Sequence, residues 1–414
     1  MTSWLIPLLI FLITVVVAWR SPRAGLFWVV LAIPAYVIKF NIGALPTTLT
    51  EIMLWAVLVG WLTQHPLSHL RRLVLSYRPI GWELGLLFIG LVIGIVVSGD
   101  WRLSLGIVKG WFVDPLIVYG LVVVILGTPK IHDLVPVLML STLPISLTAI
   151  IQVITRQFVT IDGRASAWFA SANYLALYLV PIILLGSYLL FEPRYRHSNF
   201  FFWLITIPSL IAVYFSYSYG GWLALAVGTL VIIIWQFRQR WQIWIAGGLA
   251  VVLAGLTQLS SDRVARMLDF RAQSSFSVRL QVWAADLLMI KDRWLTGIGL
   301  GQYPTAYPEF VGRLFPSPLE PAMLHAHNLF FQFIINLGVI GLIGFLSLLV
   351  RFFSWVARSS TGWAVSLTAA MSAILVHGLV DTPYWKNDLS ILFWLLLAIA
   401  SLTSLSKSAT PAHG

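Results

Sequence analysis

Long apolar runs alternate with short polar connections over most of this chain. A helix needs roughly 20 apolar residues to cross the hydrocarbon core of a bilayer, and many of the runs approach that length. The pattern therefore predicts an all-α, polytopic bundle of about 12–13 transmembrane spans. The predicted spans cover residues 4–19, 24–38, 48–63, 82–98, 105–127, 133–154, 172–191, 200–216, 219–237, 241–259, 326–350, 361–380 and 389–405. We expect residues 1–414 to form a single integral membrane domain.

The longest polar segment, residues 260–325, has a pattern of its own. Apolar side chains recur at helical spacing over residues 278–294, which predicts an amphipathic helix lying on the membrane or over the spans. A Gly-x-Gly-x-Gly stretch follows at residues 297–301. It lacks the G-x-x-x-x-G-K-[ST] pattern of a phosphate loop, so it predicts a tight turn.

Composition supports the membrane assignment. Of the 414 residues 59% are hydrophobic and only 10% are charged, whereas a soluble domain carries roughly 25% charged residues. The formal net charge is +11, and in a membrane protein such an excess indicates orientation rather than nucleic-acid binding. The chain has no cysteine, which excludes disulfides and thiolate metal sites.

Basic residues collect in alternate connections, and the cluster at residues 71–78 is one of them. Because positive charge marks the cytoplasmic side, this side is expected to be inside and the opposite connections outside. Segment 260–325 then lies outside, as one long extracytoplasmic segment. Arg20 and Arg23 follow the first apolar run instead of preceding it, so we expect a retained helix and not a cleaved signal peptide. The expected location is the inner membrane, with several passes.

Two histidines, His325 and His327, stand where the run at 326–350 is expected to enter the membrane. The positive end of a helix favours a neutral imidazole, which is the form that a general base needs. Gly338 follows His327 by eleven residues, so on a regular helix the two share a face. Gly341 extends a surface of small residues for close helix packing. The alternative is a glycine-packed helix whose histidines only anchor at the headgroups.

These residues also resemble a known family. His327 and Asn328, followed after nine residues by Gly338 and after two more by Gly341, match the pattern H-[NSQ]-x9-G-x-x-G. This pattern is similar to a signature of the O-antigen ligase family, polytopic enzymes related to O-antigen polymerases. The resemblance covers about residues 100–405. It implies transfer of a glycan from a polyprenyl-diphosphate carrier to an acceptor on the outer side of the cytoplasmic membrane.

Two arginines fit the resemblance. Relatives show an arginine followed closely by an aromatic residue and an asparagine, which Arg164, Phe169 and Asn173 match loosely. Arg279 stands at the start of the predicted amphipathic helix, as in relatives. A guanidinium group grips a diphosphate with two parallel hydrogen bonds, whereas the alternative for Arg164 is solvation by lipid headgroups.

Two further features bear on the site. His377 and Asp381 fall near the outer end of a late span, where an ionisable residue is a functional hypothesis, although one histidine can also simply bond a neighbouring helix. Relatives usually show Ser-Arg where this chain has Ser218 and Tyr219. Either another arginine supplies that charge, or the donor or the role differs.

The resemblance implies a glycosyltransferase of cell-envelope polysaccharide or lipopolysaccharide synthesis. His327 is the expected catalytic base, and Arg164 and Arg279 are expected to bind the diphosphate. The expected supporting residues are Asn328, His325, Gly338, Gly341, Asn173, His377 and Asp381. No H-E-x-x-H or D-x-D motif is present, so we expect a metal-independent reaction without a cofactor. The expected partners are the lipid-linked glycan donor, a lipid or glycan acceptor and the membrane, and not nucleic acid.

Some alternatives stay open at the level of sequence. Ligase and polymerase look alike, and neither the sugar nor the acceptor is specified. A transporter of small anions such as bicarbonate is an alternative of another class. Transport sites lie near the bilayer midplane between repeats, whereas the polar groups here cluster at the outer surface. Pro136 and Pro144 within one predicted span keep transport open.

Overall fold

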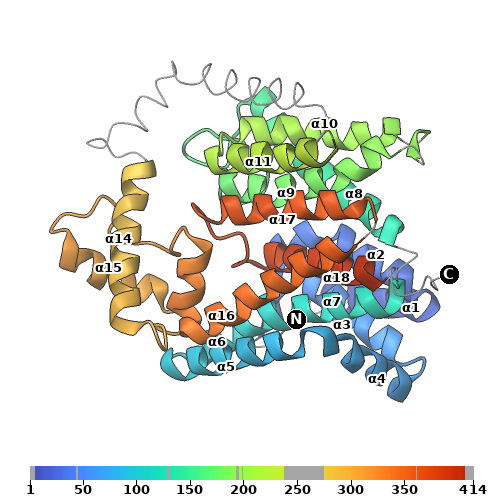
Figure 1. The fold of residues 1–414 in the computed structure, drawn as a ribbon, viewed down its shortest axis with the longest axis horizontal. Helices are drawn as coiled ribbons and strands as arrows, with labels where there is room; N and C mark the ends of the chain where they lie inside the picture. The colour runs from blue at the N-terminus through green and yellow to red at the C-terminus, as the bar shows by residue number, and fades with distance from the viewer. Residues whose placement is uncertain are drawn as a thin grey trace.

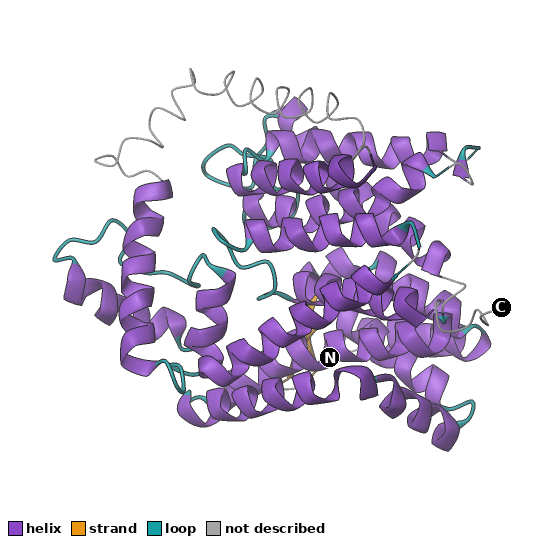
Figure 2. Cartoon of the chain, viewed as in Figure 1, coloured by secondary structure: helices purple, strands orange, loops and turns teal. Residues whose placement is uncertain are grey.

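The computed structural model describes residues 5–42, 45–127, 131–192, 195–197, 199–236, 275–359 and 361–405. Helices make up most of this part of the chain, as Figures 1 and 2 show, so the all-α prediction is confirmed. The strands in the described ranges are β1 (Lys39–Ile42) and β2 (Leu45–Thr48), which form one antiparallel hairpin. The apolar pattern did not predict this hairpin.

The first third of the chain contains seven α-helices. They are α1 (Leu5–Arg20), α2 (Pro22–Leu31), α3 (Leu49–Leu62), α4 (Pro66–Ser76), α5 (Gly81–Val97), α6 (Trp101–Val108) and α7 (Asp114–Leu126). A 3₁₀ segment η2 (Arg78–Ile80) joins α4 to α5, and a π-helical turn η3 (Lys109–Val113) joins α6 to α7. A capping box between Thr48 and Glu51 starts α3, because each side chain bonds the other's backbone N–H.

One predicted span in this region is wrong. The run at 24–38 is divided between the short helix α2 and the 3₁₀ helix η1 (Ile33–Val37). Pro34 lacks the backbone N–H that a continuing α-helix would need, so α2 ends at Leu31.

The later helices include the longest ones. They are α8 (Ile131–Thr155), α9 (Ala172–Phe191), α10 (Asn199–Phe215), α11 (Tyr219–Gln236), α14 (Ser275–Arg293), α15 (Tyr303–Leu314), α16 (Leu329–Arg358), α17 (Trp363–His377) and α18 (Asn387–Leu405). Helix α14 confirms that the segment predicted as an amphipathic helix is helical, whereas α15 was not predicted. The predicted span at 241–259 lies outside the described residues.

Six helices of the described ranges are long and apolar enough to cross a membrane. They are Pro66–Val97, Trp101–Leu126, His132–Thr155, Ala172–Phe191, Leu329–Arg358 and Asn387–Ser404. The other predicted spans within the described residues correspond to shorter apolar helices. The chain is thus a multi-pass membrane protein with an α-helical bundle.

The helices pack in two main groups (Figure 1). Helices α8, α9, α10, α11 and α17 lie together in one group, and α5, α7, α16 and α18 lie in the other. Helix α18 is buried along almost its whole length, where Trp394 bonds the hydroxyl of Tyr384. Helices α14 and α15 stand together at the left-hand end of the view and share a small apolar core with the start of α16. This end of the bundle also holds the loops that precede α16 and α18.

Helix α16 contains a break at Gly338, whose φ of 66° lies in the left-handed region. A side chain there would collide with the carbonyl of Leu295, and the neighbouring Val339 N–H donates to Trp294 O at 2.9 Å. His327 lies before the helix, which begins at Leu329. The prediction that His327 and Gly338 share one helical face is therefore wrong, because no regular helix joins them.

The small-residue surface of α16 is confirmed. A Cβ added at Gly90 on α5 would lie 2.6 Å from the Cα of Gly341, and one added at Gly344 would lie 2.8 Å from the backbone N of Leu87. These glycines let the backbones of α5 and α16 touch.

The glycines at 297, 299 and 301 all have positive φ, between 69° and 97°. Their backbone packs on helices α5 and α16, since Leu300 N–H donates to Gly94 O and Ile298 N–H donates to Ile335 O. The predicted tight turn is confirmed, and it fixes α14 and α15 against α5 and α16.

Candidate active site

The loop before α16 places the two predicted histidines. His327 has a φ of 47°, an uncommon backbone conformation for a residue other than glycine, and Asn328 follows it as the N-cap of α16. The Asn328 side chain accepts hydrogen bonds from the N–H groups of Phe330 and Phe331 at 3.0 and 3.1 Å. It also donates to Leu379 O at 3.1 Å. Asn328 therefore joins the histidine loop to the loop that carries Asp381.

Asp381 lies close to one nitrogen of each imidazole ring. Its Oδ1 lies 3.6 Å from His327 Nδ1 and 3.7 Å from His325 Nε2, and the residue is 2% exposed. The ring centroids of His325 and His327 are 4.3 Å apart. These separations exceed a direct hydrogen bond, so the interaction is mainly electrostatic. The backbone N–H of Thr382 donates to the same Oδ1 at 2.9 Å.

Asn173, at the start of α9, connects this cluster to Arg164. Its Nδ2 donates to Asp381 Oδ2 at 3.0 Å, and its Oδ1 accepts from an Arg164 terminal nitrogen at 3.5 Å. Arg164 also pairs with Asp162 in its own loop. The loosely matched Arg164 and Asn173 thus belong to one polar chain with Asp381.

Arg279 reaches the same cluster from α14. Its Nε donates to Val380 O at 3.0 Å, next to Asp381. One turn further along α14, Trp283 donates from its indole N–H to His327 O at 3.3 Å. Helix α14 therefore positions the arginine and also holds the backbone of His327.

The electrostatics favour a neutral His327 beside an ionised Asp381. Burial lowers the pKa of His327 and the charges of His325 and Arg279 add to this effect, whereas Asp381 opposes it. Burial alone would raise the pKa of Asp381, but the two histidines hold it well below its ordinary value. Since His327 Nδ1 faces the carboxylate, we assign its proton to Nδ1, which leaves the Nε2 lone pair free to accept a proton.

Burial also acts on Arg279. It lowers the pKa of this guanidinium, and the nearby charge of Arg164 lowers it further, while Asp381 raises it. The two arginines are thus close enough to feel each other's charge. An anion with two negative groups is the natural ligand for such a pair.

The other predicted residues lie around this cluster. His377 is 2% exposed at the end of α17, and its ring packs against Gly220 of α11. Gly338 and Gly341 shape α16 and do not reach the imidazoles. Tyr219 begins α11, and its ring packs on Trp222.

Lys386 and Tyr174 were not among the sequence-predicted site residues. The Lys386 Nζ lies 3.5 Å from the Tyr174 ring centroid and 5.1 Å from those of Tyr36 and Phe169. Burial lowers the pKa of Lys386. Tyr174 also stacks on His325, with centroids 6.3 Å apart. The rings of Tyr36, Phe169 and Tyr174 thus form an aromatic cage around Lys386. The cage and the lysine come from three distant segments, so in the sequence only Tyr174, next to Asn173, could have indicated it.

The histidine cluster is also a possible metal-ligand set. His325, His327 and Asp381 each offer one ligand atom, and the three atoms lie within 4.8 Å of one another. The sequence motifs for metal binding did not predict this set, because Asp381 comes from a different loop.

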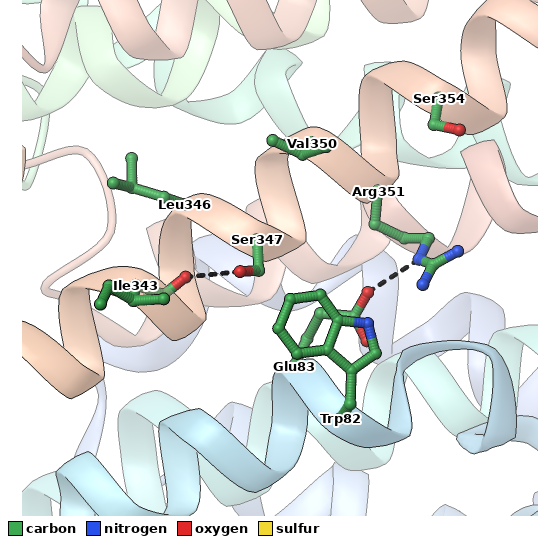
Figure 3. A pocket seen from close by; sticks show the side chains of 8 residues that line it. All are labelled: Trp82, Glu83, Ile343, Leu346, Ser347, Val350, Arg351 and Ser354. Carbon is green, nitrogen blue, oxygen red and sulfur yellow. Dashed lines mark hydrogen bonds and ion pairs between the residues drawn. The ribbon is translucent and has the colours of Figure 1, made fainter.

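A separate cavity of roughly 460 Å³ opens between α5 and α16, as Figure 3 shows. It is lined by Trp82, Glu83, Ile343, Leu346, Ser347, Val350, Arg351 and Ser354. Arg351 bonds Glu83 at 2.7 Å there. The lining residues of α16 come after the break at Gly338, whereas the histidines precede the helix, so the cavity is separate from the histidine cluster.

Comparison with known proteins identifies the middle of the chain. Residues 204–346 match the family model described as O-Antigen ligase. The matched region includes Arg279, His327 and Asn328, whereas Arg164 and Asp381 lie outside it. No curated protein matches the chain. The family resemblance is confirmed.

Proposed function

Because residues 204–346 belong to the O-antigen ligase family, we propose that this membrane protein is a glycosyltransferase. In this proposal it transfers a glycan from a polyprenyl-diphosphate carrier to an acceptor hydroxyl at the outer face of the cytoplasmic membrane. The observation that supports it most is the cluster of His327 on Asp381 with Arg164 and Arg279 beside them.

His327 is the general base of the proposed reaction. Asp381 orients the ring and holds the proton on Nδ1, so Nε2 accepts the proton of the acceptor hydroxyl. The hydroxyl oxygen forms a bond to the anomeric carbon as it loses that proton. The carboxylate then stabilises the imidazolium that results, in the same way that an aspartate serves a catalytic histidine elsewhere.

The arginines act on the leaving group. As the bond between the anomeric carbon and the diphosphate oxygen breaks, its electron pair leaves with the diphosphate. Arg164 bonds Asn173, which bonds Asp381, and Arg279 bonds the carbonyl of Val380 next to Asp381. In this proposal both guanidinium groups neutralise the developing charge. Two guanidinium groups supply the positive charge that a metal ion would otherwise supply, so the proposed reaction needs no metal. They also supply charge in place of the arginine that Tyr219 replaces.

The proposal is tested with purified protein and a polyprenyl-diphosphate-linked glycan as donor. His327→Ala should reduce transfer by about 10²–10⁴-fold, the range typical of a general base. The variant should keep the wild-type melting temperature, because the Nδ1 atom of His327 has no hydrogen-bond partner within the described residues.

His325→Ala should be milder than His327→Ala, and His197→Ala should leave transfer unchanged because His197 is exposed and remote from the site. Wild-type transfer by His327→Ala would refute the role of the base. Transfer that is absent from the wild-type protein, with uptake of a small anion into liposomes instead, would replace the enzyme with the transporter.

A further inference from the structure

The three ligand atoms of His325, His327 and Asp381 have a spacing that suits a small transition-metal ion. In a tetrahedral zinc site the metal–ligand bonds are about 2.0–2.2 Å long, so neighbouring ligand atoms are about 3.4 Å apart. The Asp381 oxygen is 3.6 Å from one imidazole nitrogen and 3.7 Å from the other. All three ligand atoms lie within 4.8 Å of one another, so side-chain shifts would bring them to the spacing of a metal site.

The atoms that face the centre of the cluster are available as ligands. His327 Nδ1 is buried and has no hydrogen-bond partner within the described part of the chain. Asp381 is held from outside the cluster, since Asn173 donates to its Oδ2 at 3.0 Å and the Thr382 N–H donates to Oδ1 at 2.9 Å. Such bonds to a ligating carboxylate orient it and increase metal affinity.

We propose that His325, His327 and Asp381 form an inhibitory site for zinc or a similar divalent transition metal. Two imidazoles and one carboxylate select zinc, nickel or copper over magnesium and calcium, which prefer oxygen ligands. A fourth position stays open for water. The inhibitory effect rests on the proposed function, whereas binding of the metal itself does not.

The inhibition follows from the two nitrogens of one ring. A metal ion bound at His327 Nδ1 displaces the proton from that atom, and a neutral imidazole then carries its proton on Nε2. The Nε2 lone pair, which accepts the proton of the acceptor hydroxyl in the proposed reaction, is thereby occupied. The metal also takes the carboxylate that would stabilise an imidazolium. The metal-bound protein is therefore expected to be inactive in transfer.

The charge of Arg279 opposes the metal. Arg279 bonds the carbonyl next to Asp381, and its guanidinium is close enough to act on both His327 and Asp381. We therefore expect binding that is weaker than in a four-ligand structural zinc site and that is reversed by a chelator. This suits a site that responds to the metal concentration outside the cell.

Binding is tested on chelator-treated, purified full-length protein with CoCl₂ and ZnCl₂. Wild-type protein should bind one Co²⁺ per chain with the visible absorption of a tetrahedral site, and Zn²⁺ should displace it. His325→Ala and His325→Gln should lose this absorption. Asn173→Ala, which removes the outer bond to Asp381 together with the bond from Arg164, should weaken binding by about 10–100-fold. His197→Ala removes an exposed histidine elsewhere and should bind as the wild type does.

Inhibition is tested in the glycan-transfer assay over the same range of ZnCl₂. Wild-type transfer should fall as the site fills and recover with chelator, whereas His325→Ala should keep its own zinc-free rate. Absence of stoichiometric Co²⁺ binding by the wild type, or wild-type Co²⁺ binding by both His325 variants, would overturn the site. Full wild-type transfer at saturating zinc would overturn the inhibition. If the protein catalyses no transfer at all, the proposed function fails while the Co²⁺ result still decides the metal site.

Discussion

At the scale of single residues, the site depends on one buried carboxylate serving two histidines. Sequence reasoning identified His327 through its spacing to Gly338, and it identified Asp381 only as an ionisable residue near the end of a span. It could not show that the two lie 3.6 Å apart, because 54 residues of chain and two helices separate them. Lys386 was not predicted because the aromatic residues around it are distant in the sequence and come together only in the folded chain.

The pH dependence of transfer should report the environment of His327. Burial lowers the pKa of His327, so the neutral base persists below its ordinary value of about 6.5 and transfer should fall only at more acidic pH. Asp381 raises this pKa, so Asp381→Asn should move the acid limb to still lower pH while reducing the maximal rate. The measurement is kcat/KM against pH for both proteins. An acid limb that moves to higher pH in Asp381→Asn would contradict the assigned pairing.

The arginines should be individually necessary. Arg164→Ala and Arg279→Ala should each slow transfer by about 10²–10³-fold, the loss typical of one charge-stabilising group. Lysine should restore little activity, because a point charge cannot reproduce the guanidinium fork. Arg313→Ala serves as the control, since Arg313 forms an ion pair on the surface of α15. Full transfer by both alanine variants, at normal protein levels, would remove the diphosphate assignment.

At the scale of helices, the glycine pattern was informative about packing and misleading about direction. Counting turns of a regular helix placed His327 and Gly338 on one face. In the structure Gly338 has left-handed φ and packs against the backbone of the turn that follows α14. Glycine is consistent both with a small residue on a helical face and with a residue that adopts left-handed φ. Contacts with residues 294–298 decide between them, and no local pattern contains those contacts.

Two glycines on α5 give a matched test of this packing. In Gly90→Ala the new Cβ would lie 2.6 Å from the Gly341 Cα, so the two backbones must separate and about 1–3 kcal/mol of stability should be lost. A Cβ added at Gly85 would meet no atom within 4 Å. Gly85→Ala should therefore leave stability unchanged or raise it by up to about 1 kcal/mol through helix propensity. Melting of the purified proteins measures the difference. Equal melting temperatures would disprove the tight contact of α5 with α16.

At the scale of the whole molecule, hydropathy predicted the helical class and the six helices of the described ranges that are long and apolar enough to cross a membrane. It succeeded because a spanning helix must satisfy its own backbone hydrogen bonds, which makes its sequence long and apolar. It failed at residues 33–38, where Pro34 and the 3₁₀ helix η1 end the predicted run at 24–38. It also left α15 undetected, because that helix contains prolines and packs on α14 instead of on lipid.

The orientation of the molecule can be measured directly because the chain has no cysteine. Ser317 is exposed in the segment between α15 and α16, at the end of the molecule that holds the histidines, whereas Ser68 is exposed on α4 at the opposite end of the view in Figure 1. Alternating basic connections predict that the histidine end lies outside the cell. Ser317→Cys should therefore react with a membrane-impermeant maleimide in intact spheroplasts.

Ser68→Cys should react only after the membrane is permeabilised, and this second labelling confirms that its thiol is accessible. The two positions are similarly exposed, so a difference between them reports the side of the membrane and not burial. The reverse pattern would place His327, Asp381 and both arginines in the cytoplasm. They would then be separated from a glycan donor on the outer face, and the proposed transfer could not take place at this site.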